Sequence, residues 1–439
     1  MRRFSLLAAA AAIALAAPVV ARPAPGIAKA ASGAARPAYG SFGFDTAGMD
    51  RGVTPGNDWG AFTNGTYLKG LTIPADRSNY GMFTKLRDLS QERTRGIVEA
   101  AAAQTGAAKG SETQKVGDYY ASFIDEAAIE AKGLTPLGPR LADIAALTDK
   151  AGVARVLGEF SRDGTATPLS IEAQQDLKNP DIYAVYVAQG GLGMPDRDYY
   201  LDDKNPKFAD IRAKYRAYIV DMLKLANVPD AAAKGAAIYD LEVKIAKSHW
   251  TQVEQRQVEK LYNPVARTAV DGKYSGVAWT SLLTAAGVET RPELVVANPS
   301  AIAAAARLID SEPLATWQAY LTFRTLDRWA PLLPKAFVDT KFAFSGTVLS
   351  GQPENQPRWK RGVDSTSNAL GEAAGKLYVA KYFPPAAKAK ADELVRNIIA
   401  AMDARLAALT WMDARTKVEA RAKLAVFTPK IGYPDKWRD

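Results

Sequence analysis

His249 is the one histidine in a chain of 439 residues, and the sequence has no cysteine. These two residue types supply most of the bases, nucleophiles and zinc ligands of enzymes. A Ser-His-Asp triad could still use His249, but a motif with two histidines, such as HExxH, cannot exist here. His249 follows Lys247 and Ser248 at the end of an amphipathic stretch, so we expect a packed histidine favoured by the helix dipole. The sequence predicts no catalytic residue and no metal ligand.

Other catalytic motifs are incomplete. Gly371-Glu372-Ala373-Ala374-Gly375-Lys376 has three residues between its glycines instead of the four of a phosphate loop, and Leu377 stands where Ser or Thr would bind magnesium. Gly191-x-Gly193 lacks the third glycine of a dinucleotide fingerprint. Carboxylates are plentiful, so a pair for glycoside chemistry stays open, but no particular pair is marked.

The N-terminus has the pattern of a cleavable export signal. Arg2 and Arg3 precede an apolar run from Phe4 to Ala17, and small residues lead up to Ala21. The run is shorter than the roughly 20 residues that span a bilayer. We therefore expect a signal peptide over 1–21, a flexible Ala/Pro/Gly leader over 22–43, secretion to the periplasm and no stable membrane anchor.

Composition and charge narrow the class of protein. The length of 439 residues fits roughly three domain-sized units, and an apolar fraction of 48% can fill the core of a globular protein; the formal net charge is +9. Because an exported protein rarely meets nucleic acid, we expect no nucleic-acid partner. The densest basic cluster, Arg358-Trp359-Lys360-Arg361, is predicted to be a solvated or carboxylate-paired surface.

Helix dominates the expected secondary structure. Ser111 to Gln114 has the form of a capping box, and apolar residues follow at helical spacing until Gly133. Two β-rich runs, 169–173 and 182–187, flank a turn-forming tetrapeptide and predict a hairpin. Turns are expected at Asn64-Gly65 and in the loop 190–195. Aromatic residues at helical spacing are expected in the core: Trp359, Tyr378, Tyr382 and Trp411.

Ten short blocks stand between about Phe44 and Asp439. They include Asn64-Gly65-Thr66-Tyr67, Tyr80-Gly81-Met82-Phe83, Asp196-Arg197-Asp198-Tyr199-Tyr200, Arg358-Trp359-Lys360-Arg361 and Ile431-Gly432-Tyr433-Pro434. In this order they resemble the neprilysin and endothelin-converting-enzyme family of zinc metallopeptidases, of the bacterial oligopeptidase type. The resemblance implies a mainly α fold, the large helical lobe of such a peptidase with a small β-hairpin element. In the family this lobe encloses small peptides.

In that family the HExxH histidines and a later glutamate hold zinc, and all of them follow the Gly-Tyr-Pro block. This chain ends at Asp439, just past that block. We therefore expect zinc in the complete enzyme but none bound by this chain, which we interpret as the N-terminal cap before a catalytic half. Small peptides and that C-terminal half are the implied partners.

The resemblance also implies substrate-binding residues. Some members place an arginine before the Tyr-Gly pair to meet a substrate carboxylate, with a phenylalanine and an arginine after it. Phe83 and Arg87 match the later pair, whereas Asn79 stands where the first arginine would be, with Arg77 as a candidate replacement. This departure favours endopeptidase or oligopeptidase use. Helix packing for Phe83 and a surface salt bridge for Arg87 remain open.

The resemblance divides the chain into a segment over 44–75, expected to return to the catalytic lobe, and a helical cap over 76–439. Two other functions stay open. One is a non-catalytic periplasmic peptide-binding protein, and the other is a helical scaffold.

Overall fold

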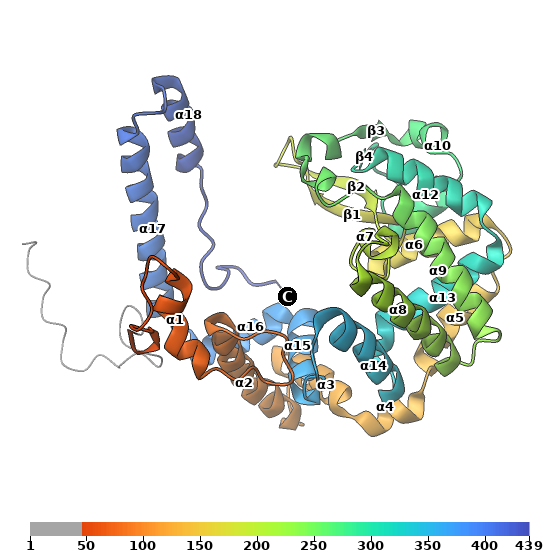
Figure 1. Cartoon of the computed structure of the whole chain (residues 1–439), viewed down its shortest axis with the longest axis horizontal. Helices are drawn as coiled ribbons and strands as arrows, with labels where there is room; N and C mark the ends of the chain where they lie inside the picture. The colour runs from red at the N-terminus through yellow and green to blue at the C-terminus, as the bar shows by residue number, and fades with distance from the viewer. Residues whose placement is uncertain (1–45, 439) are drawn as a thin grey trace, which may run out of the picture. The chain divides into compact units, whose positions relative to one another are not determined.

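The computed structural model describes residues 46–438, and the chain separates into two compact units, Met1–Thr72 and Ile73–Asp439 (Figure 1). The predicted signal peptide (1–21) and leader (22–43) lie outside the described residues. The roles assigned to 44–75 and 76–439 remain predictions.

Helix α1 (Trp59–Lys69) is the main element of the first unit. Its N-terminus is capped by Asp58, whose carboxylate accepts a hydrogen bond from the Ala61 amide at 2.8 Å. The Asn64-Gly65 pair lies inside this helix, so the predicted turn is wrong. Gly65 is needed for a different reason, because a Cβ on it would lie 2.6 Å from the Cβ of Asp50.

The second unit is mostly helical, as predicted. Its first helices are α2 (Met82–Ala103), α3 (Glu112–Ile124), α4 (Glu126–Lys132), α5 (Gly138–Ala145), α6 (Lys150–Asp163), α7 (Asp198–Leu201), α8 (Pro206–Leu225) and α9 (Ala231–Ser248). The later ones are α10 (Val270–Lys273), α11 (Trp279–Ala286), α12 (Pro299–Ser311), α13 (Leu314–Trp329), α14 (Lys335–Phe342), α15 (Arg358–Ala369), α16 (Gly371–Tyr382), α17 (Pro385–Ala408) and α18 (Ala414–Ala425).

Capping residues explain where one predicted helix divides. Ser111 caps α3 as expected, since its hydroxyl accepts from the Gln114 amide at 3.2 Å. The helix does not run on to Gly133, however. Asp125 ends α3, and its carboxylate accepts from the Ala128 amide at 3.0 Å to begin α4. The apolar spacing continues through this point, which is why periodicity alone joined the two helices.

The predicted hairpin is present and belongs to a larger sheet. Strands β1 (Leu169–Gln175) and β2 (Tyr183–Gln189) pair antiparallel with Leu169 opposite Gln189. Two short strands complete the sheet in the order β1-β2-β4-β3: β3 (Pro264–Ala266) and β4 (Glu293–Val296). Strand β4 runs parallel to β2, and α6 and α12 pack beside these strands (Figure 1). The fold is therefore the helical lobe with a four-stranded sheet.

Two hydrophobic cores stabilise the second unit. The larger one gathers side chains from α5 to α14 and the sheet, with Trp279, Trp317 and Tyr320 fully buried. The smaller one joins α2, α3, α15 and α16 around Val98, Val116 and Val363. Trp359 packs at the edge of the smaller core, so its predicted core position holds in part.

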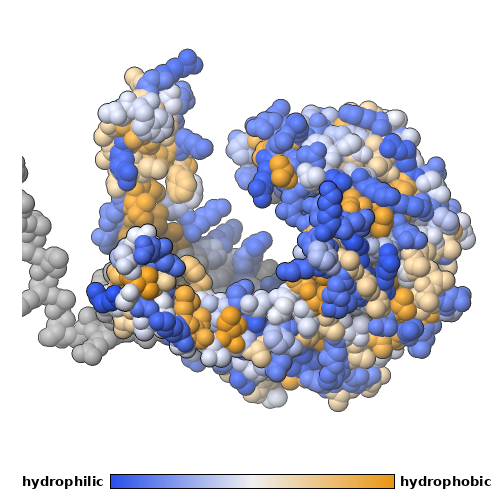
Figure 2. Space-filling view, in the orientation of Figure 1, coloured by the Kyte–Doolittle hydropathy of each residue, from blue (hydrophilic) through white to orange (hydrophobic). Residues whose placement is uncertain are grey.

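Helices α17 and α18 form a hairpin on which no residue is buried. Leu394, Ile398 and Met402 are 50–61% exposed and follow one another at four-residue intervals along α17, and Figure 2 shows apolar residues along this hairpin. Trp411, between the two helices, is 76% exposed, so its predicted place in the core is wrong. Among residues 46–438, no helix is both long and apolar enough to cross a bilayer.

Candidate functional site

Phe83 and Arg87 lie one helical turn apart on the first two turns of α2. The helix begins after Gly81, whose backbone is extended, and the spacing of four residues puts both side chains on the same face. Phe83 is 90% exposed, which excludes the helix-packing alternative. Arg87 is also exposed and makes no ion pair with any residue in 46–438, so the surface salt bridge is excluded within that range. Asn79 is exposed in the segment before α2.

Arg77 does not replace the arginine whose place Asn79 takes. Its side chain is 6% exposed, and its Nη2 donates to Asp88 Oδ1. Asp76 lies on its other side, with 3.9 Å between Asp76 Oδ1 and Arg77 Nε. A buried guanidinium held by two carboxylates is unavailable to a ligand, so this expectation is wrong.

Helix α15 holds this segment in place. Lys360 Nζ lies 2.7 Å from Asp76 Oδ2, just before the candidate residues. On α2, the buried Gln91 donates to Asp364 Oδ1 at 2.9 Å and to the Lys360 carbonyl at 3.3 Å. Because these contacts fix α2 from its inner face, Phe83 and Arg87 stay directed outward.

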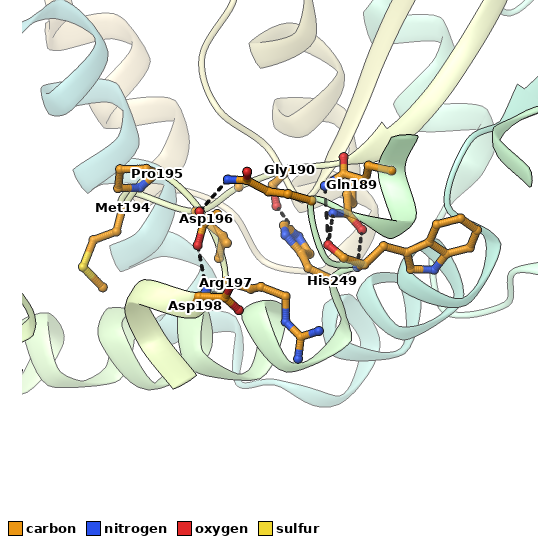
Figure 3. Close-up of a pocket in the computed structure, with 13 residues that line it drawn as sticks. Gln189, Gly190, Met194, Pro195, Asp196, Arg197, Asp198 and His249 are labelled. Carbon is orange, nitrogen blue, oxygen red and sulfur yellow. Dashed lines mark hydrogen bonds between the residues drawn. The ribbon is translucent and has the colours of Figure 1, made fainter. Parts of the chain in front are cut away.

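A second candidate surrounds the loop after β2. Its cavity of about 230 Å³ is lined by Gly190, Met194, Arg197 and His249 among others (Figure 3). Gly191 has a φ of +86°, and a Cβ on Gly193 would lie 1.7 Å from the Tyr215 hydroxyl oxygen. The predicted glycine-dependent loop is confirmed at both positions.

Buried polar groups anchor this loop from beneath. Tyr320 Oη donates to the Gly191 carbonyl at 2.8 Å, and Tyr200 Oη accepts from the Gly193 amide at 3.0 Å. Glu242 accepts from Tyr200 Oη at 2.6 Å and from Arg324 Nη2 at 2.8 Å. Burial raises the pKa of Tyr200 well above its usual range, so the hydroxyl stays protonated and keeps donating. Sequence reasoning missed this network. A signal was present, since Glu242 and Arg324 are charged residues among the apolar residues of α9 and α13.

His249 is part of the wall of this cavity. Its Nε2 lies 3.1 Å from the Gly190 carbonyl, and burial lowers its pKa to about 4, with the charge of Arg197 adding to the shift. The packed position of His249 agrees with the prediction. The helix dipole was expected to favour the protonated imidazole, but desolvation outweighs it. The neighbouring Gln189 and Trp250 bond to each other, at 2.7 Å from the Trp250 amide to Gln189 Oε1 (Figure 3). The cavity's polar groups therefore hold the loop together.

The residues present do not fit a zinc site. Within 46–438, no three His, Cys, Asp or Glu side chains come together in a way that could hold a metal ion. The donor set agrees, since the sequence offers zinc at most one imidazole and no thiolate beside its carboxylates.

Comparison with known proteins gives the family. Residues 55–434 match the N-terminal part of peptidase family M13. Mouse endothelin-converting enzyme-like 1 is 27% identical in an alignment of 413 positions that covers 89% of this chain and 52% of that protein. Human endothelin-converting enzyme 1 is 25% identical in an alignment of 408 positions that covers 88% of this chain and 51% of that protein. The chain thus spans about half the length of these curated relatives.

Solved structures agree with the fold. The zinc metalloprotease Zmp1 of Mycobacterium tuberculosis, in complex with an inhibitor, superimposes with a TM-score of 0.84 at 35% identity, covering 90% of this chain and 60% of that one. PepO from Lactobacillus rhamnosis has a TM-score of 0.75 at 20% identity, covering 88% and 60%, which supports the fold alone. The predicted resemblance is confirmed: the chain belongs to peptidase family M13, a family of zinc metallopeptidases.

Proposed function

We propose that this chain is the N-terminal, substrate-enclosing part of an exported zinc metalloendopeptidase that cleaves small peptides. The observation that carries the proposal is the outward-facing pair on α2: Phe83 is 90% exposed, and Arg87 has no ion-pair partner within 46–438. An aromatic ring beside a free guanidinium suits a peptide with an apolar side chain near a carboxylate. Asn79 would contact the same peptide without adding charge.

Catalysis in this proposal belongs to a second part of the protein. The described residues offer no metal site, so this chain would bind and orient the peptide, and zinc in the complete enzyme would supply the chemistry. Family membership supports a peptidase, and the relatives are about twice as long as the matched region.

The α17–α18 hairpin is the proposed contact surface for that catalytic part. Two helices without a buried residue, one bearing Leu394, Ile398 and Met402 in a stripe, leave apolar area in water that a partner would cover. This differs from the segment over 44–75, which the family resemblance expects to return to the catalytic lobe.

Association of the two parts tests the proposal. We would co-express tagged residues 44–439 with the C-terminal part of Zmp1 that this chain does not cover, and in parallel pair that part with its own N-terminal half. Co-purification of both pairs is expected. If only the native Zmp1 pair co-purifies, and this chain is a well-folded monomer, the proposal fails and a separate peptide-binding protein or scaffold is favoured.

Export is a separate part of the proposal. The mature protein is expected to begin near Arg22 and to appear in an osmotic-shock fraction. Recovery of the chain from membranes with Met1 intact contradicts it.

A further inference from the structure

Two arginines line one cavity, and neither has a carboxylate partner in the described part of the chain. The cavity, of about 500 Å³, lies between the end of α13, the turn after it, α3 and α15. Arg328 enters from α13 and Arg361 from α15. Within 46–438 no Asp or Glu oxygen lies within ion-pair distance of either guanidinium. Arg328 Nε and Nη2 both donate to the Asp163 carbonyl, at 3.2 and 3.0 Å. The charge that would favour an anion in this cavity is therefore mainly that of Arg361.

The neighbouring cations of the same cluster are paired, which sets Arg361 apart. Arg358 Nε lies 3.3 Å from Glu126 Oε1, and Lys360 Nζ lies 2.7 Å from Asp76 Oδ2. These two confirm the predicted carboxylate-paired surface. The prediction also allowed a solvated cation, and Arg361 is a partly exposed cation without a carboxylate partner within 46–438: its Nε donates to the Gln356 carbonyl at 3.1 Å. Its two terminal nitrogens are left to face a ligand.

The electrostatic surroundings of Arg361 point the same way. Burial lowers the pKa of Arg361, and the charge of Arg358 adds to this effect, while Glu126 and Asp339 oppose it from beyond ion-pair range. Asp364 also lines the cavity and keeps its negative charge while its Oδ1 accepts from Gln91, so two cations and one carboxylate leave a net positive charge there. A bound anion would offset that remaining charge.

The remaining wall residues are either apolar or hydrogen-bonding. Phe123, Trp329, Pro331 and Leu332 are apolar, and Leu332 is 39% exposed. Tyr119 Oη and Ser365 Oγ lie 3.0 Å apart, and Asn368 is exposed. A ligand with an apolar group and an anionic head would suit both kinds of residue.

We propose that this cavity binds a carboxylate attached to an apolar group, with Arg361 holding the carboxylate and Trp329 and Leu332 covering the apolar group. The guanidinium fork matches a planar carboxylate, which favours a carboxylate over a spherical anion. This site is separate from the Phe83 and Arg87 pair, and the inference does not depend on the proposed function.

The test titrates the full chain with N-acetyl-leucine, following tryptophan fluorescence and thermal stability. N-acetyl-leucine is expected to bind, whereas N-acetyl-leucinamide, which lacks the charge, and acetate, which lacks the apolar group, are each expected to bind at least about tenfold more weakly. Equal binding of acid and amide overturns the carboxylate assignment. Equal binding of acetate and N-acetyl-leucine overturns the role of the apolar walls.

Variants test whether N-acetyl-leucine binds in this cavity. Arg361→Gln is expected to weaken N-acetyl-leucine binding by at least about tenfold, and Ala369→Trp, at an exposed position of the wall, to block it. Arg396→Gln, at an exposed arginine on α17 outside the cavity, is the matched control and should bind like the unaltered chain. Unchanged binding in both cavity variants overturns the assignment. If Arg361→Gln does not fold, as judged by circular dichroism, Ala369→Trp and the acid-to-amide comparison still decide.

Discussion

Arg324 Nη2 donates both to Glu242 Oε1, at 2.8 Å, and to the Gly191 carbonyl, at 2.6 Å. This nitrogen thus connects α13 to α9 and to the loop after β2. The side chains of Arg324 and Glu242 are 2% and 0% exposed. A buried charge pair of this kind is costly to break from one side, because the remaining charge stays desolvated.

The first prediction concerns this pair. Arg324→Met is expected to lower the free energy of unfolding by about 3–5 kcal/mol, since it leaves the Glu242 carboxylate buried without its cation. Arg324→Lys keeps a donor and should lose less. Lys214→Met removes an exposed ion pair on α8, with side chains 52% and 62% exposed, and should change stability by under about 0.5 kcal/mol. Urea unfolding measures all three, and equal losses for Arg324→Met and Lys214→Met would contradict the buried-pair account.

The second prediction concerns the loop glycine. Gly193→Ala places a Cβ 1.7 Å from the Tyr215 hydroxyl oxygen, so the loop or the tyrosine must move, at a cost of about 1–3 kcal/mol. Gly272→Ala is the control, because nothing lies within 4 Å of a Cβ there. Thermal unfolding should separate the two variants. A Gly193→Ala protein as stable as Gly272→Ala would show that the packing around Tyr215 is looser than described.

The third prediction is a pH dependence. The folded pKa of His249 is about 4, below its ordinary value of 6.5, so unfolded chains take up a proton more readily. His249 therefore contributes stability that is present above pH 6.5 and is lost as the pH falls towards 4, by about 2–3 kcal/mol in total. His249→Gln keeps a donor for the Gly190 carbonyl but does not titrate.

The difference in unfolding free energy between the two proteins isolates this effect, because their other groups titrate alike. The gap should change between pH 6.5 and 4 in favour of the Gln variant. A constant gap across that range would mean that His249 titrates normally in the fold.

Some of these features could be predicted from the sequence because their causes are local. Ser111 caps α3 through a residue three positions away, and strands β1 and β2 are joined by a short turn. The loop at Gly191 needs a positive φ, which glycine signals by itself.

Other features depend on partners far along the chain. Strand β4 has four residues and pairs with β2, more than a hundred positions earlier, so no pattern within it shows a strand. Arg77 looked available, but its burial depends on Asp88 across a turn and on neighbouring packing. The exposed Trp411 shows the converse, since aromatic spacing indicates a face that packs but not whether its partner is present.

The fourth prediction concerns the apolar stripe of α17. The isolated chain is expected to bind a hydrophobic dye or to self-associate, and the double variant Ile398→Lys with Met402→Lys should do so less. Both side chains are at least half exposed, so the melting temperature should hardly change. Arg396→Gln on the same helix is the control. Dye binding that the double variant leaves unaltered would place the exposed apolar surface elsewhere.

The fifth prediction concerns Arg87 in a reconstituted enzyme. Arg87→Ala should lower kcat/KM about tenfold for peptides with a free C-terminal carboxylate, because a charge-assisted contact is lost. Amidated versions of the same peptides should be little affected. Equal losses for both would remove Arg87 from substrate binding and leave Phe83 to carry the site.

Zinc-dependent hydrolysis tests the central claim most directly. The purified chain, with and without the C-terminal part of Zmp1, would be assayed for bound zinc and for chelator-sensitive cleavage of short peptides. We predict no stoichiometric zinc and no cleavage for the chain alone, and both for the combined protein. Chelator-sensitive cleavage by the chain alone, free of contaminating peptidase, would contradict the account.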